Sequence, residues 1–203
     1  MIIIKYDNSL QRRMSDMSKP DVDLSGTYNY KDYLTWDGPE RWELIDGRPH
    51  LLASPTPEHQ QAAIQIGAEF AIYLRGKSCQ IFITPMDLTF QDSEETQTVV
   101  QPDLFVMCGN FFHHKRVIGV PVLIIEILSQ STAKHDLIRK LNLYQKFGVK
   151  EYWILDPIEK NINVYLHDGA KLDWTEQEFK PSDTITPTMF SDLKIDVSVI
   201  FVD

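Results

Sequence analysis

The sequence predicts an α/β (α+β) protein in which helices flank a mixed β-sheet. Residues 120–156 contain an apolar run, a helical pattern and a second apolar run. A strand–helix–strand unit of this kind requires its two strands to be parallel. The pairs Asp46-Gly47 and Asp168-Gly169 each separate two strand-like stretches, which is typical of antiparallel hairpins. Both kinds of pairing together indicate a mixed sheet with an N-terminal hairpin and a C-terminal β-ribbon.

The first predicted elements are a short helix, a hairpin and a long helix. Residues 28–36 favour the short helix, and ERWELIDGRPHLLAS, residues 40–54, predicts the hairpin. Two prolines then break the chain. From Glu58 to Leu74 apolar residues recur at helical spacing, which predicts a helix that ends near Gly76.

Three strand-like runs come next. Residues 80–90 and 98–107 are joined by a polar loop, and Pro102 within the second run suggests an edge position or a bulge. The segment GNFFHHKRVIG, residues 109–119, is a predicted loop. The run VPVLIIEIL, residues 120–128, is the first strand of the parallel unit.

The crossover helix is predicted over residues 129–147. Ser131 or Thr132 can cap its start, and Gly148 fits its end. EYWILD is the second parallel strand. The closing LKIDVSVIFVD adds a turn of helix or a strand.

The length of 203 residues suits one domain. We expect a loosely ordered extension over residues 1–26 and a single domain over 27–203, because the extension lacks any apolar period. Hydrophobic residues make up 43% and charged residues 24%, which excludes disorder throughout. A net charge of −9 excludes a generally basic nucleic-acid coat, although it leaves room for a local basic groove.

Cys79 and Cys108 are too few for a disulfide scaffold or a cysteine zinc site. We expect both to be small buried thiols in a reducing compartment. No apolar run approaches the roughly 20 residues of a membrane-spanning helix, and the N-terminus lacks a signal-peptide pattern. The sequence therefore predicts a cytoplasmic protein without a membrane partner.

Glu126 is the most informative residue, because it interrupts an otherwise apolar strand. An unpaired carboxylate there would cost several kcal/mol or stay protonated. A bound cation, a buried salt bridge or a strand end that reaches solvent would each resolve this cost.

Asp103 is a second carboxylate in an apolar run, VVQPDLFVM. If its strand pairs with that of Glu126, the two carboxylates can converge on one face. Two such oxygen ligands, with a backbone carbonyl and waters, suit Mg²⁺ or Mn²⁺.

Lys140 and Glu43 are further candidates. Lys140 borders the apolar stripe of the crossover helix, where it either pairs with Asp136 or holds a substrate phosphate and a water beside the metal. Glu43 in WELIDG is either an exposed strand-end residue or a third carboxylate of the site.

The histidines are weaker candidates. His59 follows a proline at a helix start, so a capping or surface role is the favoured interpretation. His113, His114 and His135 lack nearby partners of the right geometry. Motifs of serine hydrolases, dinucleotide-binding folds and P-loop proteins are absent from the sequence.

Several segments together resemble a known family. WELIDG, SPTPEH, VVQPDLFV, VLIIEILSQST, DLIRKLNLYQKFGVKEYWILDP and LKIDVSVIF occur in this order. Over about residues 28–201 the chain resembles the Uma family, within the restriction-endonuclease-like PD-(D/E)XK nuclease superfamily.

The resemblance implies a restriction-endonuclease-like core that binds Mg²⁺ or Mn²⁺. Asp103 matches the aspartate of the PD motif, Glu126 the acidic residue of the (D/E)XK element, and Glu43 the early glutamate. Leu128 stands where the motif lysine would be, and the resemblance implies that Lys140 replaces it from the following helix. The family commonly has Ser-Pro-Ser-Thr after the acid, whereas this chain has Gln130 in place of the proline.

These residues predict a metal-dependent endonuclease that hydrolyses phosphodiester bonds of nucleic acid, with DNA as the expected partner. Asp103, Glu126 and the Ile127 carbonyl would hold the metal. The alternative is a nuclease-fold protein that binds a partner or regulates without cutting, which the net charge of −9 favours. A homodimer is also expected. Its candidate surface consists of the aromatic residues of the loop 109–119 with Trp36, Trp42 and Trp174, and a place in the core is the alternative for these side chains.

Overall fold

A computed structural model of the chain describes residues 22–109, 111–113, 115–129, 134–167 and 174–201. The chain forms two compact units, Met1–Leu52 with Ser93–Thr98 and Ala53–Asp92 with Val99–Asp203. The extension predicted over residues 1–26 lies mostly outside the described residues. That extension and the single domain over 27–203 stay predictions.

The first unit contains the predicted N-terminal hairpin, which is confirmed. A short helix, α2 (Tyr30–Tyr33), precedes β1 (Arg41–Ile45) and β2 (Arg48–Leu52), which pair antiparallel. Asp46 and Gly47 both have positive φ, of 47° and 78°, as a two-residue hairpin turn of the Asp-Gly type requires.

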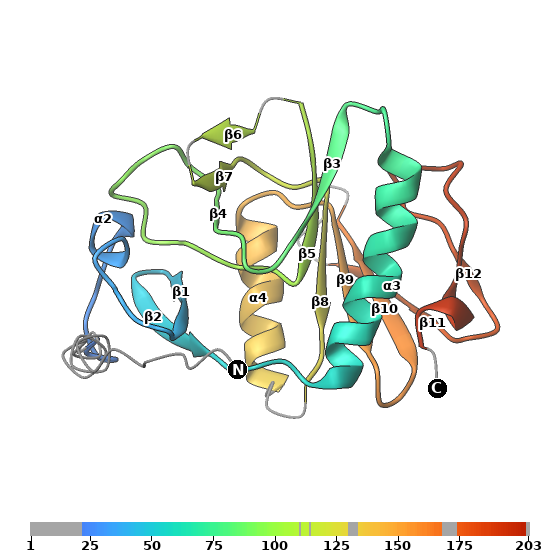
Figure 1. Cartoon of the computed structure of the whole chain (residues 1–203), viewed down its shortest axis with the longest axis horizontal. Coiled ribbons are helices and arrows are strands. Elements are labelled where there is room, and N and C mark those ends of the chain that lie inside the picture. The colour runs from blue at the N-terminus through green and yellow to red at the C-terminus, as the bar shows by residue number, and fades with distance from the viewer. Residues whose placement is uncertain (1–21, 110, 114, 130–133, 168–173, 202–203) are drawn as a thin grey trace, which may run out of the picture. The chain divides into compact units, whose positions relative to one another are not determined.

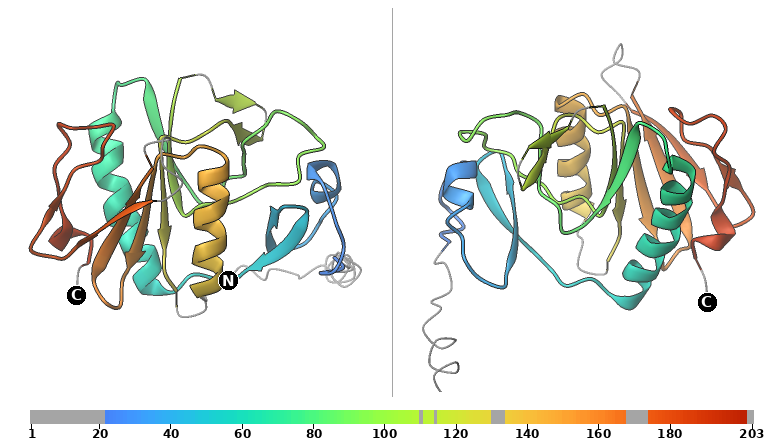
Figure 2. Two further views of the ribbon diagram at one scale, coloured as in Figure 1. Left: turned by 180° about the vertical axis from the view of Figure 1, so that it is seen from behind. Right: turned by 45° about the horizontal axis from the view of Figure 1, so that its top comes forward.

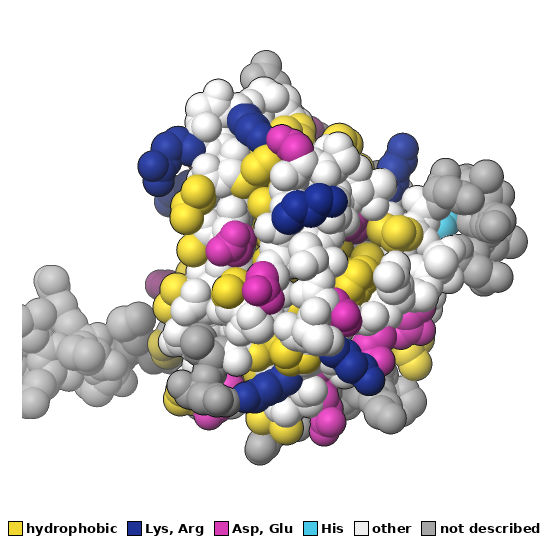
Figure 3. Space-filling model, turned by 90° about the vertical axis from the view of Figure 1, so that its right-hand side faces the viewer, with side chains coloured by type: hydrophobic (Ala, Val, Ile, Leu, Met, Phe, Trp, Pro, Cys, Tyr) yellow, Lys and Arg dark blue, Asp and Glu magenta, His cyan; other side chains and the backbone are white. Residues whose placement is uncertain are grey.

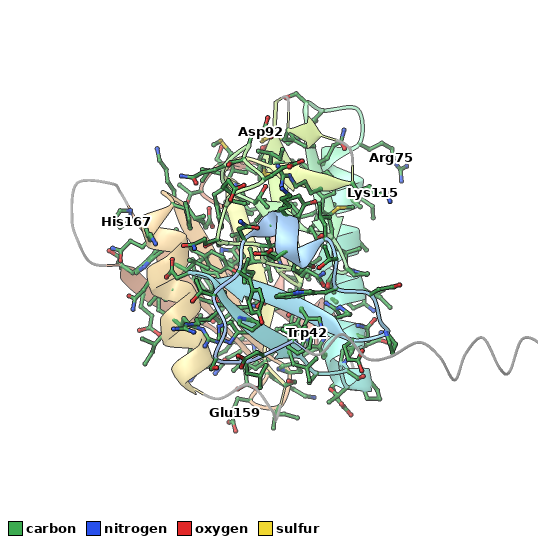
Figure 4. All side chains as sticks on the ribbon, turned by 90° about the vertical axis from the view of Figure 1, so that its left-hand side faces the viewer. Trp42, Arg75, Asp92, Lys115, Glu159 and His167 are labelled. Atoms are coloured by element: carbon green, nitrogen blue, oxygen red, sulfur yellow. A yellow bond between two sulfur atoms is a disulfide. The ribbon has the colours of Figure 1, made fainter. Side chains whose placement is uncertain are left out.

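Aromatic rings pack together within this first unit. Trp42 of β1 (labelled in Figure 4) meets Trp36 with ring centroids 5.8 Å apart, and Trp36 meets Tyr28 at 5.2 Å and Tyr33 at 5.3 Å. Trp36 and Trp42 are half-buried, so much of their surface already packs inside the unit. The homodimer stays a prediction.

The second unit is built on a six-stranded mixed sheet in the order β11-β10-β9-β8-β5-β3 (Figure 1). β8 and β9 are parallel and every other neighbouring pair is antiparallel. This confirms the predicted mixed sheet, the strand–helix–strand crossover and the C-terminal ribbon. The strands are β3 (Cys79–Ile83), β5 (Leu104–Cys108), β8 (Leu123–Ile127), β9 (Glu151–Asp156), β10 (Asn161–Leu166) and β11 (Thr175–Phe179).

Helices α3 (Pro57–Leu74) and α4 (Lys134–Lys146) cover opposite faces of this sheet (Figures 1 and 2). Successive strand residues point to opposite faces, so β8 divides its side chains between the two helices. Ile125 and Ile127 join the core beneath α3. Glu126 therefore points to the face that α4 covers. The α3 side of this core also includes Ala62, Ala63, Ile66, Phe70 and Leu74.

Gly67 allows α3 to approach the sheet closely. A Cβ atom at this position would lie 3.2 Å from Cδ2 of Leu104 in β5. That is tighter than an ordinary van der Waals contact, so with a Cβ here the Leu104 side chain would have to move by a few tenths of an ångström. The helix is capped by Thr56, whose Oγ1 accepts from the backbone N–H of His59 at 3.3 Å.

Two predicted strands are shorter than expected. The run 80–90 is broken between β3 and β4 (Leu88–Thr89). The run 98–107 becomes bridge residues at Val99 and Val100, of which Val100 pairs with Leu88, followed by β5. Pro102 lacks a backbone N–H and precedes the strand instead of lying at an edge or a bulge. Asp103 is therefore a bend residue immediately before β5, and the prediction that it lies within a strand is wrong.

The segment predicted as a loop over residues 109–119 also contains strands. β6 (Phe112–His113) and β7 (Arg116–Ile118) form a three-stranded sheet with β4. Phe111 is 7% exposed and meets Phe82 with centroids 5.5 Å apart, so it belongs to the interior rather than to a dimer surface.

Cys79 and Cys108 form a disulfide across β3 and β5. They are directly opposite in the antiparallel register, with Cα atoms 4.1 Å apart. The prediction of two free thiols is wrong, because two residues far apart in sequence are brought face to face by a register that the sequence does not reveal. The cytoplasmic location rested partly on those thiols and stays a prediction.

The C-terminal segment contains both elements that the sequence allowed. β12 (Thr184–Ile185) pairs with β13 (Ile195–Asp196), and a turn of 3₁₀ helix follows over Val197–Val199. The predicted caps Ser131 and Thr132 lie outside the described residues. Among those that are described, no helix has the length and apolar character to cross a membrane.

Glu151 is a buried carboxylate at the start of β9. It is 2% exposed, and its two oxygens accept from Trp153 Nε1 at 2.8 Å and from the backbone N–H of Thr188 at 2.9 Å. Burial raises the pKa of Glu151, while these neutral donors offset part of the effect.

We expect Glu151→Gln to gain stability relative to the wild type as pH rises. Because the pKa of Glu151 is raised in the folded state, folding is penalised once that carboxyl must ionise, and stability is lost as pH rises through the folded pKa. Glutamine does not titrate, so its contribution to stability is the same at every pH. It has only one acceptor oxygen for the two donors, Trp153 Nε1 and the Thr188 N–H, which gives a constant cost. Urea unfolding of both proteins from about pH 4.5 upward measures the difference, and a difference independent of pH would contradict the expectation.

Candidate active site

Asp103 is fixed by two donors from different elements. Its Oδ2 accepts from the backbone N–H of Ile127 at 2.8 Å and lies 3.0 Å from Nε2 of His59. Neither contact uses Oδ1. Since Ile127 directly follows Glu126, the first bond brings the Asp103 carboxylate to the peptide group beside the second predicted carboxylate.

His59 is the partner of Asp103 that the sequence interpretation missed. It lies in the first turn of α3 and is 6% exposed, so the surface role favoured from the sequence is wrong. The Thr56 cap and Pro57 start the helix here and fix the turn that carries His59. Its place at a helix start and its place at the end of the SPTPEH segment were the sequence signals, and neither identifies which side of the helix is buried.

Glu126 lies within β8 and is bonded to α4. Its Oε1 accepts from Nζ of Lys140 at 2.9 Å and from the hydroxyl of Tyr144 at 2.7 Å. All three residues are buried, with exposures of 7% for Glu126, 7% for Lys140 and 0% for Tyr144. An ion pair and a hydrogen bond therefore compensate the cost of burying a carboxylate in this strand. A buried salt bridge was one of the three alternatives that the sequence left open.

Lys140 and Tyr144 come together because they are four residues apart on one helix. Tyr144 is therefore more than a packing residue of α4, because its hydroxyl donates to Glu126. The alternative partner of Lys140, Asp136, has a side chain outside the described residues. Leu128 occupies the motif lysine position and is half-buried, so the cation at Glu126 comes from α4 instead.

Glu43 belongs to the first unit of the chain. It is 1% exposed within β1 and lies opposite His50 in the hairpin register, so it is not an exposed strand-end residue. A role for Glu43 in one site with Asp103 and Glu126 stays a prediction.

The described residues suit a hard cation better than zinc. They contain no group of three or more His, Cys, Asp and Glu side chains placed to hold a metal. Asp103 and Glu126 both offer carboxylate oxygens, and Asp103 accepts from the backbone N–H of the residue that follows Glu126. The contacts given above fall on one oxygen of each carboxylate, Oδ2 of Asp103 and Oε1 of Glu126. Mg²⁺ characteristically binds through one or two carboxylates and retains several waters, so this donor set fits Mg²⁺ or Mn²⁺.

A groove of about 630 Å³ lies at the other end of the parallel strands. It is lined by Val122 just before β8 and by Glu151 at the start of β9, whereas Glu126 and Ile127 close β8. None of the candidate site residues lines this groove, so the groove and the carboxylate pair are separate features.

Comparisons with known proteins identify the family and the fold of the chain. The model of the Uma2 family, described as "Putative restriction endonuclease", matches residues 30–198. An uncharacterized protein of Synechocystis is 24% identical over 159 residues, which cover 76% of this chain and 82% of the relative. A crystal structure from Anabaena variabilis, described as a "putative nuclease belonging to DUF820", aligns with a TM-score of 0.70 at 18% identity and covers 86% of this chain and 97% of that chain. This likeness confirms the predicted fold.

Proposed function

Because the chain belongs to the Uma2 family, as its motifs predicted, we propose that it is a metal-dependent endonuclease that hydrolyses phosphodiester bonds of nucleic acid. DNA is the first substrate to test. The observation that supports this proposal is the 2.8 Å bond from the Ile127 N–H to Asp103 Oδ2, which ties the predicted PD aspartate to the peptide group that follows Glu126.

Asp103 and Glu126 would hold Mg²⁺ or Mn²⁺, with the Ile127 carbonyl as a further ligand. When bound, such a cation supplies charge stabilisation at a phosphate and lowers the pKa of an attacking water. The neighbouring protein groups keep these ligands in place: the Ile127 amide and His59 act on Asp103, and Lys140 and Tyr144 act on Glu126.

Lys140 would also stabilise the negative charge that develops on the phosphate. Its Nζ donates to Glu126 at 2.9 Å, which holds a positive charge beside this predicted metal ligand. Its burial at 7% exposure strengthens its electrostatic effect relative to a surface lysine. Glu43 would assist the metal or the water.

The alternative, a nuclease-fold protein that binds without cutting, has one observation in its favour. The net charge is −9, and the face of the second unit shown in Figure 3 carries lysine and arginine side chains scattered among acidic and apolar ones. Nucleic-acid affinity depends strongly on clustered basic contacts to phosphates.

The test is cutting of single-stranded and duplex DNA by the purified protein, with and without Mg²⁺ or Mn²⁺, beside Asp103→Ala. We expect metal-dependent cutting by the wild type and its loss in the variant. Absence of both cutting and metal binding would overturn the proposal of a nuclease and favour a nuclease-fold protein that binds a partner without cutting. Absence of cutting with Asp103-dependent metal binding would overturn DNA as the substrate and direct the assay to RNA.

A further inference from the structure

We infer that His59 is a positioning residue that orients the Asp103 carboxylate for metal binding, an inference that rests on the proposed function. Asp103 precedes β5 in a bend, so no strand ladder fixes the direction of its side chain. Its direction depends on the two contacts to Oδ2, from the Ile127 amide and from His59. Only the second contact is made by a side chain.

The chemistry of this contact defines the tautomer of His59. An ionised carboxylate only accepts hydrogen bonds, so Nε2 of His59 carries the proton and donates to Oδ2 at 3.0 Å. In the neutral ring Nδ1 is then an acceptor, and it is buried without a hydrogen-bond partner among the described residues. A helix anchor that served stability alone would gain from a donor at Nδ1 or from an apolar side chain, because a buried unpaired acceptor carries a cost.

The position of His59 explains how this orientation is transmitted. The Thr56 cap fixes the first turn of α3, and the ring is 6% exposed, so it has little freedom to rotate away. The ring therefore links the start of α3 to the bend before β5. Protein groups that orient a metal ligand in this way typically change metal affinity by about 10–100-fold when they are removed.

Three substitutions separate a positioning role from a purely structural one. His59→Leu removes the donor. His59→Gln and His59→Asn carry the same amide, but only the longer glutamine brings its NH₂ group to the place of Nε2. We expect the affinity for Mn²⁺, measured by calorimetry on the full chain without nucleic acid, to fall about 10–100-fold in His59→Leu and His59→Asn. It should stay within a few-fold of the wild type in His59→Gln and in the exposed control Gln61→Leu.

The outcomes distinguish this inference from the proposed function. Equal Mn²⁺ affinity of the wild type and His59→Leu would overturn the positioning role and leave the metal site intact. Equal weakening in the glutamine and asparagine variants would also overturn it, because the position of the donor would then have no influence. No Mn²⁺ binding by the wild type would overturn both the positioning role of His59 and the proposed metal-dependent function. If His59→Leu fails to fold, the comparison of Mn²⁺ affinity between His59→Gln and His59→Asn still tests the positioning role.

Discussion

Replacing Lys140 by methionine is expected to lower the free energy of unfolding by about 3–5 kcal/mol. Lys140 and Glu126 form an ion pair at 2.9 Å, with side chains only 8% and 10% exposed. Without the ammonium, Glu126 keeps the Tyr144 hydroxyl but loses its ion pair with Lys140 while it stays buried in an apolar strand. Urea unfolding followed by circular dichroism measures the loss.

The double variant Glu126→Gln with Lys140→Met should recover much of that loss, because it removes both charges together. Glutamine can still accept from Tyr144 through its carbonyl oxygen. A matched control is Lys180→Met: Lys180 pairs with Glu178 at 3.5 Å, but their side chains are 65% and 46% exposed. This exposed pair should change stability by less than about 1 kcal/mol. If Lys140→Met and Lys180→Met lowered the free energy of unfolding equally, the buried pair would contribute no more to stability than the exposed pair.

The two members of the buried Lys140–Glu126 pair should not be equally costly to remove. Glu126 is short and fixed on a central strand, whereas Lys140 has a long flexible side chain on a helix. A lysine left alone can move its ammonium toward water, which a strand glutamate cannot do. Lys140→Met should therefore destabilise the protein more than Glu126→Gln.

The carboxylates were predictable from the sequence, but the groups that hold them were only partly so. Glu126 and Asp103 stand out because a charge in an apolar run requires compensation. Tyr144 was within reach of prediction, since it follows Lys140 by one helical turn. His59 was not, because its contact with Asp103 spans 44 residues and depends on the packing of α3 against the sheet. The relation of Glu43 to these residues is a question of tertiary packing that no local pattern addresses.

Local signals also explain which parts of the fold were predicted. The Asp46-Gly47 turn and the crossover between β8 and β9 follow from turn chemistry and periodicity, and both are confirmed. The short strands β4, β6 and β7 were missed because two or three residues are too few to show a period, and their pairing depends on distant partners. The Cys79–Cys108 bond was missed for the same reason, since strand register is set by the whole sheet.

Asp103→Asn and Glu126→Gln are each expected to reduce metal-dependent cutting by about 100-fold or more, because each would remove a charged metal ligand rather than a group that supports one. Both substitutions keep nearly the same shape and retain an oxygen that can accept the existing hydrogen bonds. Single-turnover cleavage at saturating DNA, over a range of Mg²⁺ concentrations, measures the effect. Glu178→Gln, an exposed carboxylate change, should leave the rate unaltered.

The double variant Asp103→Asn with Glu126→Gln should cut little more slowly than either single variant. Residues that act as one unit give strongly non-additive losses, since the first substitution already disables the unit. The Ile127 amide, which bonds to Asp103 directly beside Glu126, is the structural reason to expect such a unit. If the two losses multiplied, or if one variant alone kept the wild-type rate, the carboxylates would serve separate roles. The shared metal site would then have to be abandoned, even with cutting confirmed.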